Sequence, residues 1–286
     1  MIYHYVEGSY LDGLFGGVPR FDFELHKTIS ELKTIKINDD IKFKDNDIVI
    51  TGNDLCNKIP NHITCIVVHH GLARVHQERE PDWDGTHYVI GQDKMIHRPN
   101  TIFVAPSSYC EKQFFKYYNK KDDYKIFHSV DTKPLGEPKR EKIIIGDWRN
   151  NNKGSNIIDK LRETKKFKFI NLKCDKYHKS EAYSQASIYL TLSLSEGCSY
   201  SQLDALACDL PVLSTNVSLF DGDCDDTCGL SIDWTERENI DLIIDKLEYI
   251  YNNYTKFNPR TWLLKKNNFE TWKLKWKELI DEVYKN

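Results

Sequence analysis

The chain has 286 residues, which exceeds an average domain and favours two domains of comparable size. Its 40% hydrophobic and 29% charged residues indicate a globular protein, and its net charge of −3 argues against a surface dominated by nucleic-acid or anionic-membrane contacts. No apolar run approaches the roughly 20 residues that cross a bilayer. The first ten residues lack the order of a signal peptide, so we expect a cytoplasmic protein without a membrane span, whose eight cysteines are free thiols.

Short apolar runs alternate with helical patterns along the chain, which predicts parallel α/β sheets. The runs predicted as strands are, in chain order, 47–51, 65–70, 87–91, 102–106, 142–146, 168–171, 188–193 and 211–215. The helices expected between or after them are 22–32, 108–118, 155–163, 180–186, 201–209 and 239–252. Segment 131–140 holds two prolines and a glycine and is the predicted linker. In the tail, Trp272, Trp276, Leu279 and Val283 form one helical stripe, which predicts a final helix docked on the protein itself.

A polar loop follows the strand predicted at 142–146, in the stretch IIIGDWRNNNKGSNII (143–158). Arg149 offers a planar fork of donors and Lys153 a compact positive charge, a combination suited to a diphosphate. In open α/β sheets ligands bind beyond the carboxyl ends of the strands, where this loop is expected. The alternative is a solvent-exposed basic loop. The glycine spacing excludes a P-loop.

The stretch LSLSEGCSYSQLDALACDLPVLSTN (192–216) places two carboxylates around one helix start. Backbone N–H groups at such a start favour a phosphate, while Glu196 is placed to hold sugar hydroxyls and Asp204 to hold a ribose. The alternative is that Glu196 caps the helix and Asp204 lies on the surface. The candidate donor-binding residues here are Glu196, Gly197, Cys198, Ser199, Tyr200, Ser201 and Asp204.

This stretch resembles the signature of retaining GT-B glycosyltransferases of the family 4 type (glycosyl transferases group 1), which carry Glu-x7-Glu. The positions in register are Ser193, Glu196, Gly197, Asp204, Ala205, Ala207, Pro211 and Val212. Three positions depart: Asp204 replaces the second Glu, Cys198-Ser199 replaces Phe-Gly, and Asp209 replaces a Gly. GDWRNNNKG is similar to the family's Gly-Arg and Lys-Gly pair, and KIFHSVDTKP (125–134) is similar to the stretch that ends its first domain.

The resemblance also extends to the amino-terminal half. Gly16 and Gly17 match the family's early Gly-Gly loop, which approaches the donor phosphates. The strand at 65–70 ends in two histidines, as the family's strand ends in a histidine near the transferred sugar; His70 is favoured over His69 because it directly precedes a glycine. The segment FDGDCDDTCG (220–229) lacks the pairing of a zinc site and the spacing of an EF-hand, so no metal is expected.

The resemblance therefore implies two Rossmann-like domains facing across a cleft, at 1–134 and 135–262, with a helix at 263–286 returning to the first. It implies a retaining hexosyl- or pentosyltransferase that moves a sugar from a nucleoside diphosphate to a hydroxyl acceptor, a glycan or small molecule, without a cofactor. The catalytic set implied is His70, Glu196, Arg149 and Lys153. Two alternatives stay open: a viral or phage enzyme that glycosylates hydroxymethylated DNA bases in the host cytoplasm, and an inactive nucleotide-sugar-binding protein.

Overall fold

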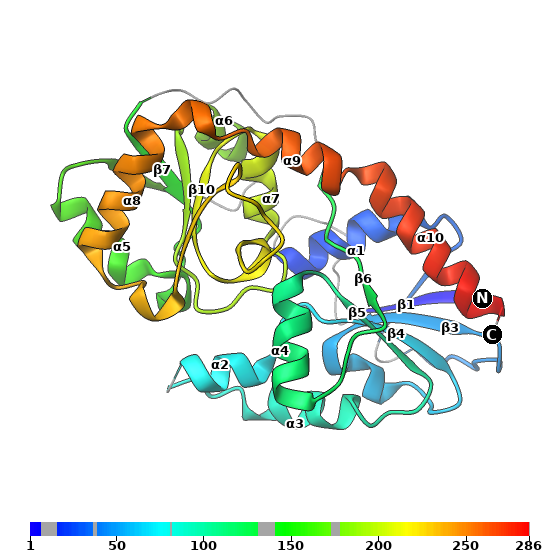
Figure 1. The fold of residues 1–286 in the computed structure, drawn as a ribbon. Coiled ribbons are helices and arrows are strands. Elements are labelled where there is room, and N and C mark those ends of the chain that lie inside the picture. Colours follow the sequence, from blue (N-terminus) through cyan, green and yellow to red (C-terminus); the bar gives the residue numbers. More distant parts are fainter. Residues whose placement is uncertain (7–15, 37–38, 81, 131–140, 173–177, 286) are drawn as a thin grey trace. The chain divides into compact units, whose positions relative to one another are not determined.

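The computed structural model describes residues 1–6, 16–36, 39–80, 82–130, 141–172 and 178–285, without the side chains of 178–181. The chain divides into two compact units (Figure 1). Unit 1 combines Met1–His128 with Glu270–Asn286, and unit 2 is Ser129–Phe269. The predicted linker, 131–140, lies outside the described residues.

Unit 1 contains one sheet of parallel strands, six among the described residues, in the order β2-β1-β3-β4-β5-β6. The strands are β1 (Ile2–Val6), β2 (Lys33–Lys36), β3 (Ile48–Gly52), β4 (Thr64–Val68), β5 (Thr101–Ala105) and β6 (Tyr124–Lys125). After β1 the chain first adds β2 on one side and then returns to add β3 on the other. This reversal leaves a crevice at the carboxyl ends of β1 and β3, where doubly wound sheets bind their ligands.

The helices of unit 1 bury apolar side chains against this sheet. They are α1 (Gly17–Thr28), the 3₁₀ turn η2 (Asn53–Lys58), α2 (Ala73–Arg79), α3 (Thr86–Met95), α4 (Ser108–Tyr118) and α10 (Phe269–Lys285). Figure 1 shows α1 and α10 side by side. Phe21 of α1 contacts Trp272 and Trp276 of α10, with ring centroids 6.3 and 5.8 Å apart, and both tryptophans are fully buried. The apolar stripe of the tail therefore packs within unit 1.

The strand predicted at 87–91 is wrong, because these residues lie in α3. Val89, Gln92 and Met95 are buried at helical spacing, whereas Tyr88 and Ile90 are each 51% exposed. A strand buried on both faces would have enclosed all five residues of HYVIG. A short apolar run fits both the two-residue period of a strand and the 3.6-residue period of a helix. The burial of only one face identifies this segment as a helix.

Unit 2 contains a second parallel sheet, five-stranded in the part of the chain that is described, in the order β11-β10-β9-β7-β8. Its strands are β7 (Ile143–Gly146), β8 (Lys168–Asn171), β9 (Ile188–Thr191), β10 (Val212–Thr215) and β11 (Gly229–Ile232). Its helices are α5 (Ser155–Glu163), α6 (His178–Gln185), α7 (Tyr200–Ala207), α8 (Ile240–Asn252) and α9 (Pro259–Lys266), with 3₁₀ turns η3 (Asn151–Lys153), η4 (Ser218–Phe220), η5 (Trp234–Glu236) and η6 (Tyr254–Lys256). The order repeats that of unit 1, so the corresponding crevice lies between β7 and β9.

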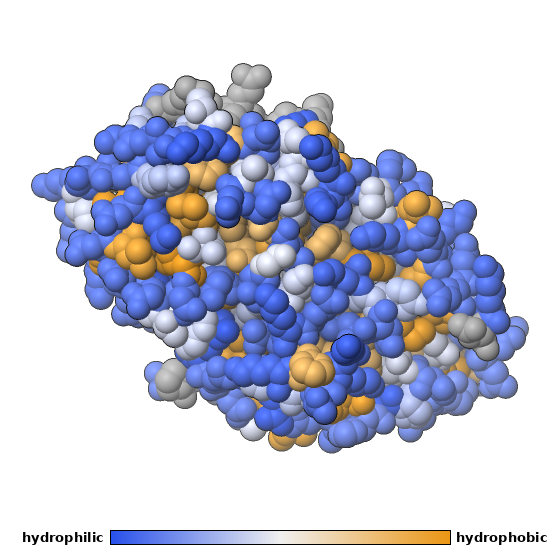
Figure 2. Space-filling model, in the orientation of Figure 1, coloured by the Kyte–Doolittle hydropathy of each residue, from blue (hydrophilic) through white to orange (hydrophobic). Residues whose placement is uncertain are grey.

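Both units are α/β folds with buried parallel strands, as the sequence predicts. In unit 2 the core between sheet and helices includes Ile144, Leu161, Leu190, Leu213 and Leu247, all fully buried. None of the described helices is long and apolar enough to cross a bilayer. Figure 2 shows a face that is mostly hydrophilic, with hydrophobic residues between polar ones.

Candidate functional site

The carboxyl ends of β7 and β9 bring together the two sequence motifs of unit 2. The loop after β7 carries Asp147, Arg149 and Lys153, and the loop after β9 carries Glu196. We call these four residues the charged cluster. Lys153 Nζ lies 2.7 Å from Glu196 Oε1 and 3.4 Å from Asp147 Oδ2. Arg149 donates two hydrogen bonds to Asp147, at 2.8 and 2.9 Å.

Lys153 is the centre of this cluster. Burial lowers the pKa of its ammonium, but the neighbouring carboxylates Glu196 and Asp147 outweigh burial and raise that pKa above its ordinary value. Lys153 therefore stays charged at any physiological pH. Its side chain is 21% exposed, against 49% for Arg149. The interpretation as a solvent-exposed basic loop thus describes Arg149 but not Lys153.

Hydrogen bonds of two buried side chains, Trp148 and Arg237, hold the loop that carries Lys153. Trp148 is buried; its indole N–H donates to the Leu190 carbonyl at 3.1 Å, and its backbone N–H donates to Asn171. The buried Arg237 donates to the carbonyls of Asn151, Asn152 and Leu192, which joins the loop to the end of β9. These bonds hold the backbone that precedes Lys153.

Gly154, which follows Lys153, has a left-handed backbone with φ of 87°. A Cβ there would lie 2.7 Å from that of Leu192, so glycine lets the loop turn sharply into α5 beside β9.

The start of α7 shows that Glu196 is not a helix cap. Ser199 is the cap residue, and its side chain accepts from the backbone N–H of Gln202. Glu196 instead accepts hydrogen bonds from Lys153 and from the Ser193 hydroxyl, at 2.7 and 2.9 Å. Asp204 is only 4% exposed, so the alternative that placed it on the surface is also wrong.

The other predicted donor-binding residues surround this helix start. Cys198, Ser199 and Tyr200 are nearly buried, whereas Ser201 and Glu196 are partly exposed, and Gly197 lies between Glu196 and the cap. The structure therefore groups Lys153 with Glu196 directly and places Asp204 one turn into α7, inside the protein. Their roles in donor binding stay predictions.

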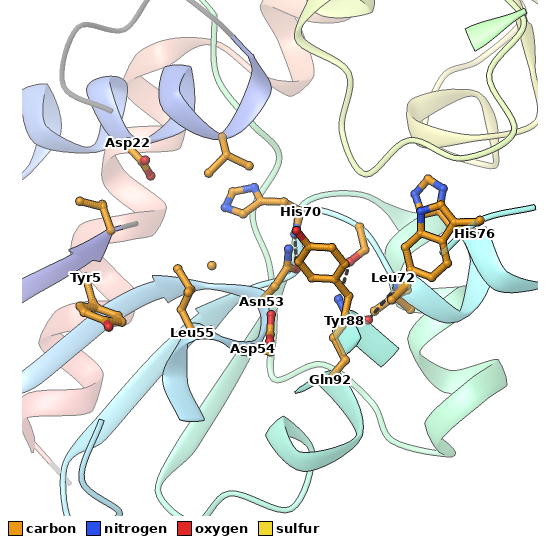
Figure 3. A pocket seen from close by; sticks show the side chains of 16 residues that line it. Tyr5, Asp22, Asn53, Asp54, Leu55, His70, Leu72, His76, Tyr88 and Gln92 are labelled. Atoms are coloured by element: carbon orange, nitrogen blue, oxygen red, sulfur yellow. Dashed lines mark hydrogen bonds between the residues drawn. The ribbon is translucent and has the colours of Figure 1, made fainter. Parts of the chain in front are cut away.

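In unit 1 the crevice between β1 and β3 contains a pocket of about 380 Å³ (Figure 3). It is lined by residues from β1, α1, the turn after β3, the loop after β4, and α2 and α3. The lining residues used below are Asp22, Gly52, Asp54, His70, His76, Trp83 and Tyr88. The crevice where the strand order reverses therefore contains a cavity in unit 1 and the charged cluster in unit 2.

The two histidines after β4 have different environments. His69 is fully buried, with its Nε2 atom 2.6 Å from Asp122 and its ring stacked on Phe103. His70 lines the pocket, and its backbone N–H donates to Asn53. Burial lowers the pKa of His70 well below its ordinary value, and His128, His4 and His69 lower it further, so the imidazole is neutral. Of the two predicted candidates, His70 is the one that reaches the cavity.

The Gly-Gly pair lies at the start of α1. Gly16 precedes the helix with φ of 105°, a conformation that glycine adopts readily, and Gly17 is the first helical residue. The preceding residues, 7–15, are outside the described part of the chain. The predicted contact of Gly16 and Gly17 with donor phosphates stays a prediction.

Sequence reasoning missed several polar residues of both sites. Asp147 was not selected, although it neighbours the Trp-Arg pair of the predicted loop, and it contacts both basic residues of the cluster. Asp22 and His4 were also missed: Asp22 lines the pocket, and the Nε2 atom of His4 lies 3.1 Å from its carboxylate. The position of His4 between apolar and aromatic residues in β1 is only a weak signal of a functional residue, because a lone histidine in a strand does not reveal its partner.

Solved structures resemble the whole chain at low sequence identity. Sucrose-phosphate synthase (tll1590) from Thermosynechococcus elongatus matches with a TM-score of 0.76 and 12% identity over 99% of both chains. Anabaena Alr3699/HepE in complex with UDP and glucose matches with a TM-score of 0.71 and 9% identity, over 98% of this chain and 99% of that one. The pneumococcal O-GlcNAc transferase GtfA in complex with UDP and GlcNAc matches with a TM-score of 0.60 and 16% identity, over 95% of this chain and 61% of its own. These likenesses show the GT-B fold.

The family itself follows from the sequence. A comparison with curated proteins found no match. The family model described as "Glycosyl transferases group 1" matches residues 101–259, more than half of the chain, and includes the charged cluster and α7. The chain is therefore a member of the group 1 glycosyl transferases, and the protein is a glycosyltransferase.

Proposed function

We propose that this protein transfers a sugar from a nucleoside diphosphate donor to a hydroxyl group, with retention of configuration at the anomeric carbon. The donor would bind to unit 2. The observation that carries the proposal is the position of Lys153 between Glu196 and Asp147 at the crevice of the second sheet. A fixed cation there, beside the start of α7, suits a diphosphate.

The residues of the charged cluster have proposed roles, and so do Asp204 and His70 outside it. Lys153 and Arg149 stabilise the negative charge that develops on the leaving diphosphate, which is where preorganised cations contribute most to rate. Glu196 holds hydroxyls of the donor sugar and Asp204 the ribose. His70, neutral at physiological pH, contacts the transferred sugar from unit 1. Asp147 keeps both cations oriented before the donor arrives.

Retention is proposed from the resemblance of 193–212 to the retaining signature, since Ser193 and Glu196 occupy its positions and are hydrogen-bonded to each other. The nucleotide base, the sugar and the acceptor are to be found by experiment. Two of the similar structures, those of HepE and GtfA, are complexes with UDP, which puts UDP-sugars first among the donors to try.

The test begins with binding of UDP, GDP and ADP, because a ligand that binds the native state raises its melting temperature. We expect one diphosphate to be selected, and Arg149→Ala to weaken it about threefold to tenfold. Arg162→Ala is the matched control: Arg162 is as exposed as Arg149 and also pairs with a nearby aspartate, but on α5. Loss of affinity in both variants, or in neither, would contradict the assigned phosphate site.

The selected diphosphate sugar is then offered with acceptors, and the anomeric configuration of the product is read by NMR. An inverted product would overturn the retaining mechanism. Binding of the donor without any transfer or hydrolysis would support the inactive binding protein instead. Salt-dependent binding of DNA, followed by its glycosylation, would support the nucleic-acid acceptor.

A further inference from the structure

We infer that the pocket of unit 1 binds the acceptor, and that it selects an uncharged polyol, one hydroxyl group of which donates a hydrogen bond to Asp22. This inference deepens the proposed function and rests on it. It depends on three properties of the pocket: an incompletely satisfied carboxylate, the absence of cationic side chains from its described lining, and an aromatic wall.

Asp22 is the first of these properties. It lies on α1, is 3% exposed and contributes to the pocket wall (Figure 3). Its Oδ1 atom lies 3.1 Å from His4 Nε2, whereas its Oδ2 atom has no hydrogen-bond partner among the described residues. A buried carboxylate oxygen without a partner is costly, and a hydroxyl donor supplied by a ligand would satisfy it.

A chain of side chains behind Asp22 holds the carboxylate in place. His4 is buried in β1, and its second ring nitrogen lies 3.2 Å from His26 Nε2, which is in turn 3.0 Å from the Thr34 hydroxyl. Because His4 uses both nitrogens, it fixes the Oδ1 atom of Asp22, while the Oδ2 atom stays buried without a partner among the described residues. Positioning of this kind is typical of groups that bind a substrate hydroxyl.

His70 supplies a second polar group without adding charge. Its Nδ1 atom is buried and has no hydrogen-bond partner within the described part of the chain. Its ring packs edge-on against Phe21, with centroids 4.8 Å apart, and a Cβ on Gly52 would come within 2.9 Å of it. The close packing holds the imidazole rigidly, so the pocket offers a carboxylate and a neutral ring to its ligand.

The charge of the lining decides the class of that ligand. Two carboxylates, Asp22 and Asp54, line the pocket, and the described lining includes no lysine or arginine. A phosphate or carboxylate group on the acceptor would therefore meet like charge without a compensating cation. Sugar hydroxyls, in contrast, donate to carboxylates and exchange hydrogen bonds with a neutral imidazole.

The aromatic wall completes the site. His76 stacks on Trp83 with ring centroids 5.5 Å apart, and Trp83 stacks on Tyr88 at 6.4 Å, both with interplanar angles of 26°. All three rings line the pocket, and such flat apolar faces suit the C–H face of a sugar ring. The volume of about 380 Å³ is at the lower end of the range of small-molecule pockets, which suits a small acceptor or the end of a glycan.

The test uses saturation-transfer NMR on the full chain. Its neutral probes are methyl α-glucoside, methyl β-galactoside and myo-inositol, and its anionic probes are glucose 6-phosphate and glucuronate. We expect saturation transfer to at least one neutral probe and none to the anionic probes. Asp22→Asn should weaken the neutral probe at least tenfold. Glu24→Gln, a carboxylate on the same helix paired with Lys27, should leave it unchanged.

Tyr88→Ala provides a second variant that does not disturb the core, because Tyr88 is 51% exposed; it should weaken binding of the neutral probe severalfold.

Three outcomes would overturn the inference: saturation transfer to an anionic probe equal to that of the neutral ones, no transfer to any neutral probe, or unchanged affinity in both Asp22→Asn and Tyr88→Ala. Diphosphate binding, measured on the same samples, keeps the two proposals apart. Asp22→Asn should keep the wild-type thermal shift. Failure of every diphosphate to bind the wild type would defeat the proposed function, and with it the role of the ligand as acceptor, while saturation transfer would still show whether the pocket prefers neutral polyols.

Discussion

Both units have polar side chains at the crevice where the strand order reverses, but these side chains differ in how far their charges are already paired. In unit 2, Lys153 and Arg149 already have carboxylate partners in the charged cluster. In unit 1, Asp22 has one partner and a second oxygen without any among the described residues. The comparison teaches that a crevice between parallel strands fixes where a ligand binds, while the side chains decide which ligand it is.

The difference has a simple electrostatic origin. A diphosphate brings charges of its own, so a site for it needs cations that are held in place, and carboxylates hold them until the donor arrives. An uncharged polyol brings only hydroxyls, so a site for it needs acceptors and donors that are desolvated and oriented. Three substitutions test this contrast, ordered here from the largest expected effect to the smallest.

Trp148→Ala should have the largest effect, because it removes a buried indole and its hydrogen bond to Leu190. Loss of a buried tryptophan typically costs about 3–5 kcal/mol of unfolding free energy. Urea unfolding measures this cost, and the loop that carries Lys153 should lose its affinity for the diphosphate. Binding of the neutral sugar to unit 1 serves as the control. If that binding fell in parallel, the two sites would not be independent.

Lys153→Ala should come second. It removes the cation at the centre of the charged cluster, so release of the nucleoside diphosphate from its sugar should slow about 10²-fold or more. It also leaves Glu196 and Asp147 without their shared partner, at a stability cost of about 1–2 kcal/mol because the groups are partly solvated. Lys160→Ala, an exposed lysine of α5, is the control. Equal turnover in the two variants would contradict the assignment of the diphosphate site to the charged cluster.

His70→Gln should have the smallest effect, visible as a change in pH dependence. Burial depresses the pKa of His70 in the folded state, so below about pH 6.5 the unfolded chain binds a proton that the folded chain does not. Stability then decreases as the pH is lowered, by about 1.4 kcal/mol per pH unit for each such group. His26, whose pKa is lowered by burial and by His4, adds to this slope, whereas Lys153 remains charged throughout.

Urea unfolding between pH 7.5 and 5 measures that slope. His70→Gln should reduce the slope by the contribution of one group, about 1.4 kcal/mol per pH unit. His87→Gln, at an exposed position, should leave the slope as in the wild type. An unchanged slope in His70→Gln would mean that folding does not lower the pKa of His70. It would then also remove the neutral imidazole from the pocket described above.

Much of the fold was predictable because buried parallel strands carry a local signal. The runs predicted at 65–70 and 102–106 begin with continuously apolar residues, 65–68 and 102–105, and these residues lie in β4 and β5. The prediction of a strand at 87–91 was wrong for a local reason as well, since the sequence HYVIG fits the period of a strand and that of a helix. β2 (Lys33–Lys36) was missed because only one of its four residues is buried at the edge of the sheet.

The sequence by itself determined the parallel α/β class, the family, and Lys153 and Glu196 as separate candidates, because these depend on short motifs whose spacing is fixed within a strand, loop and helix. Only the tertiary structure decided that His70 rather than His69 reaches a cavity, that Asp147 shares Lys153, and that Asp22 depends on His4. Those relations join residues from different strands and helices. They arise from the strand order and the packing of helices on the sheet, which no local pattern encodes.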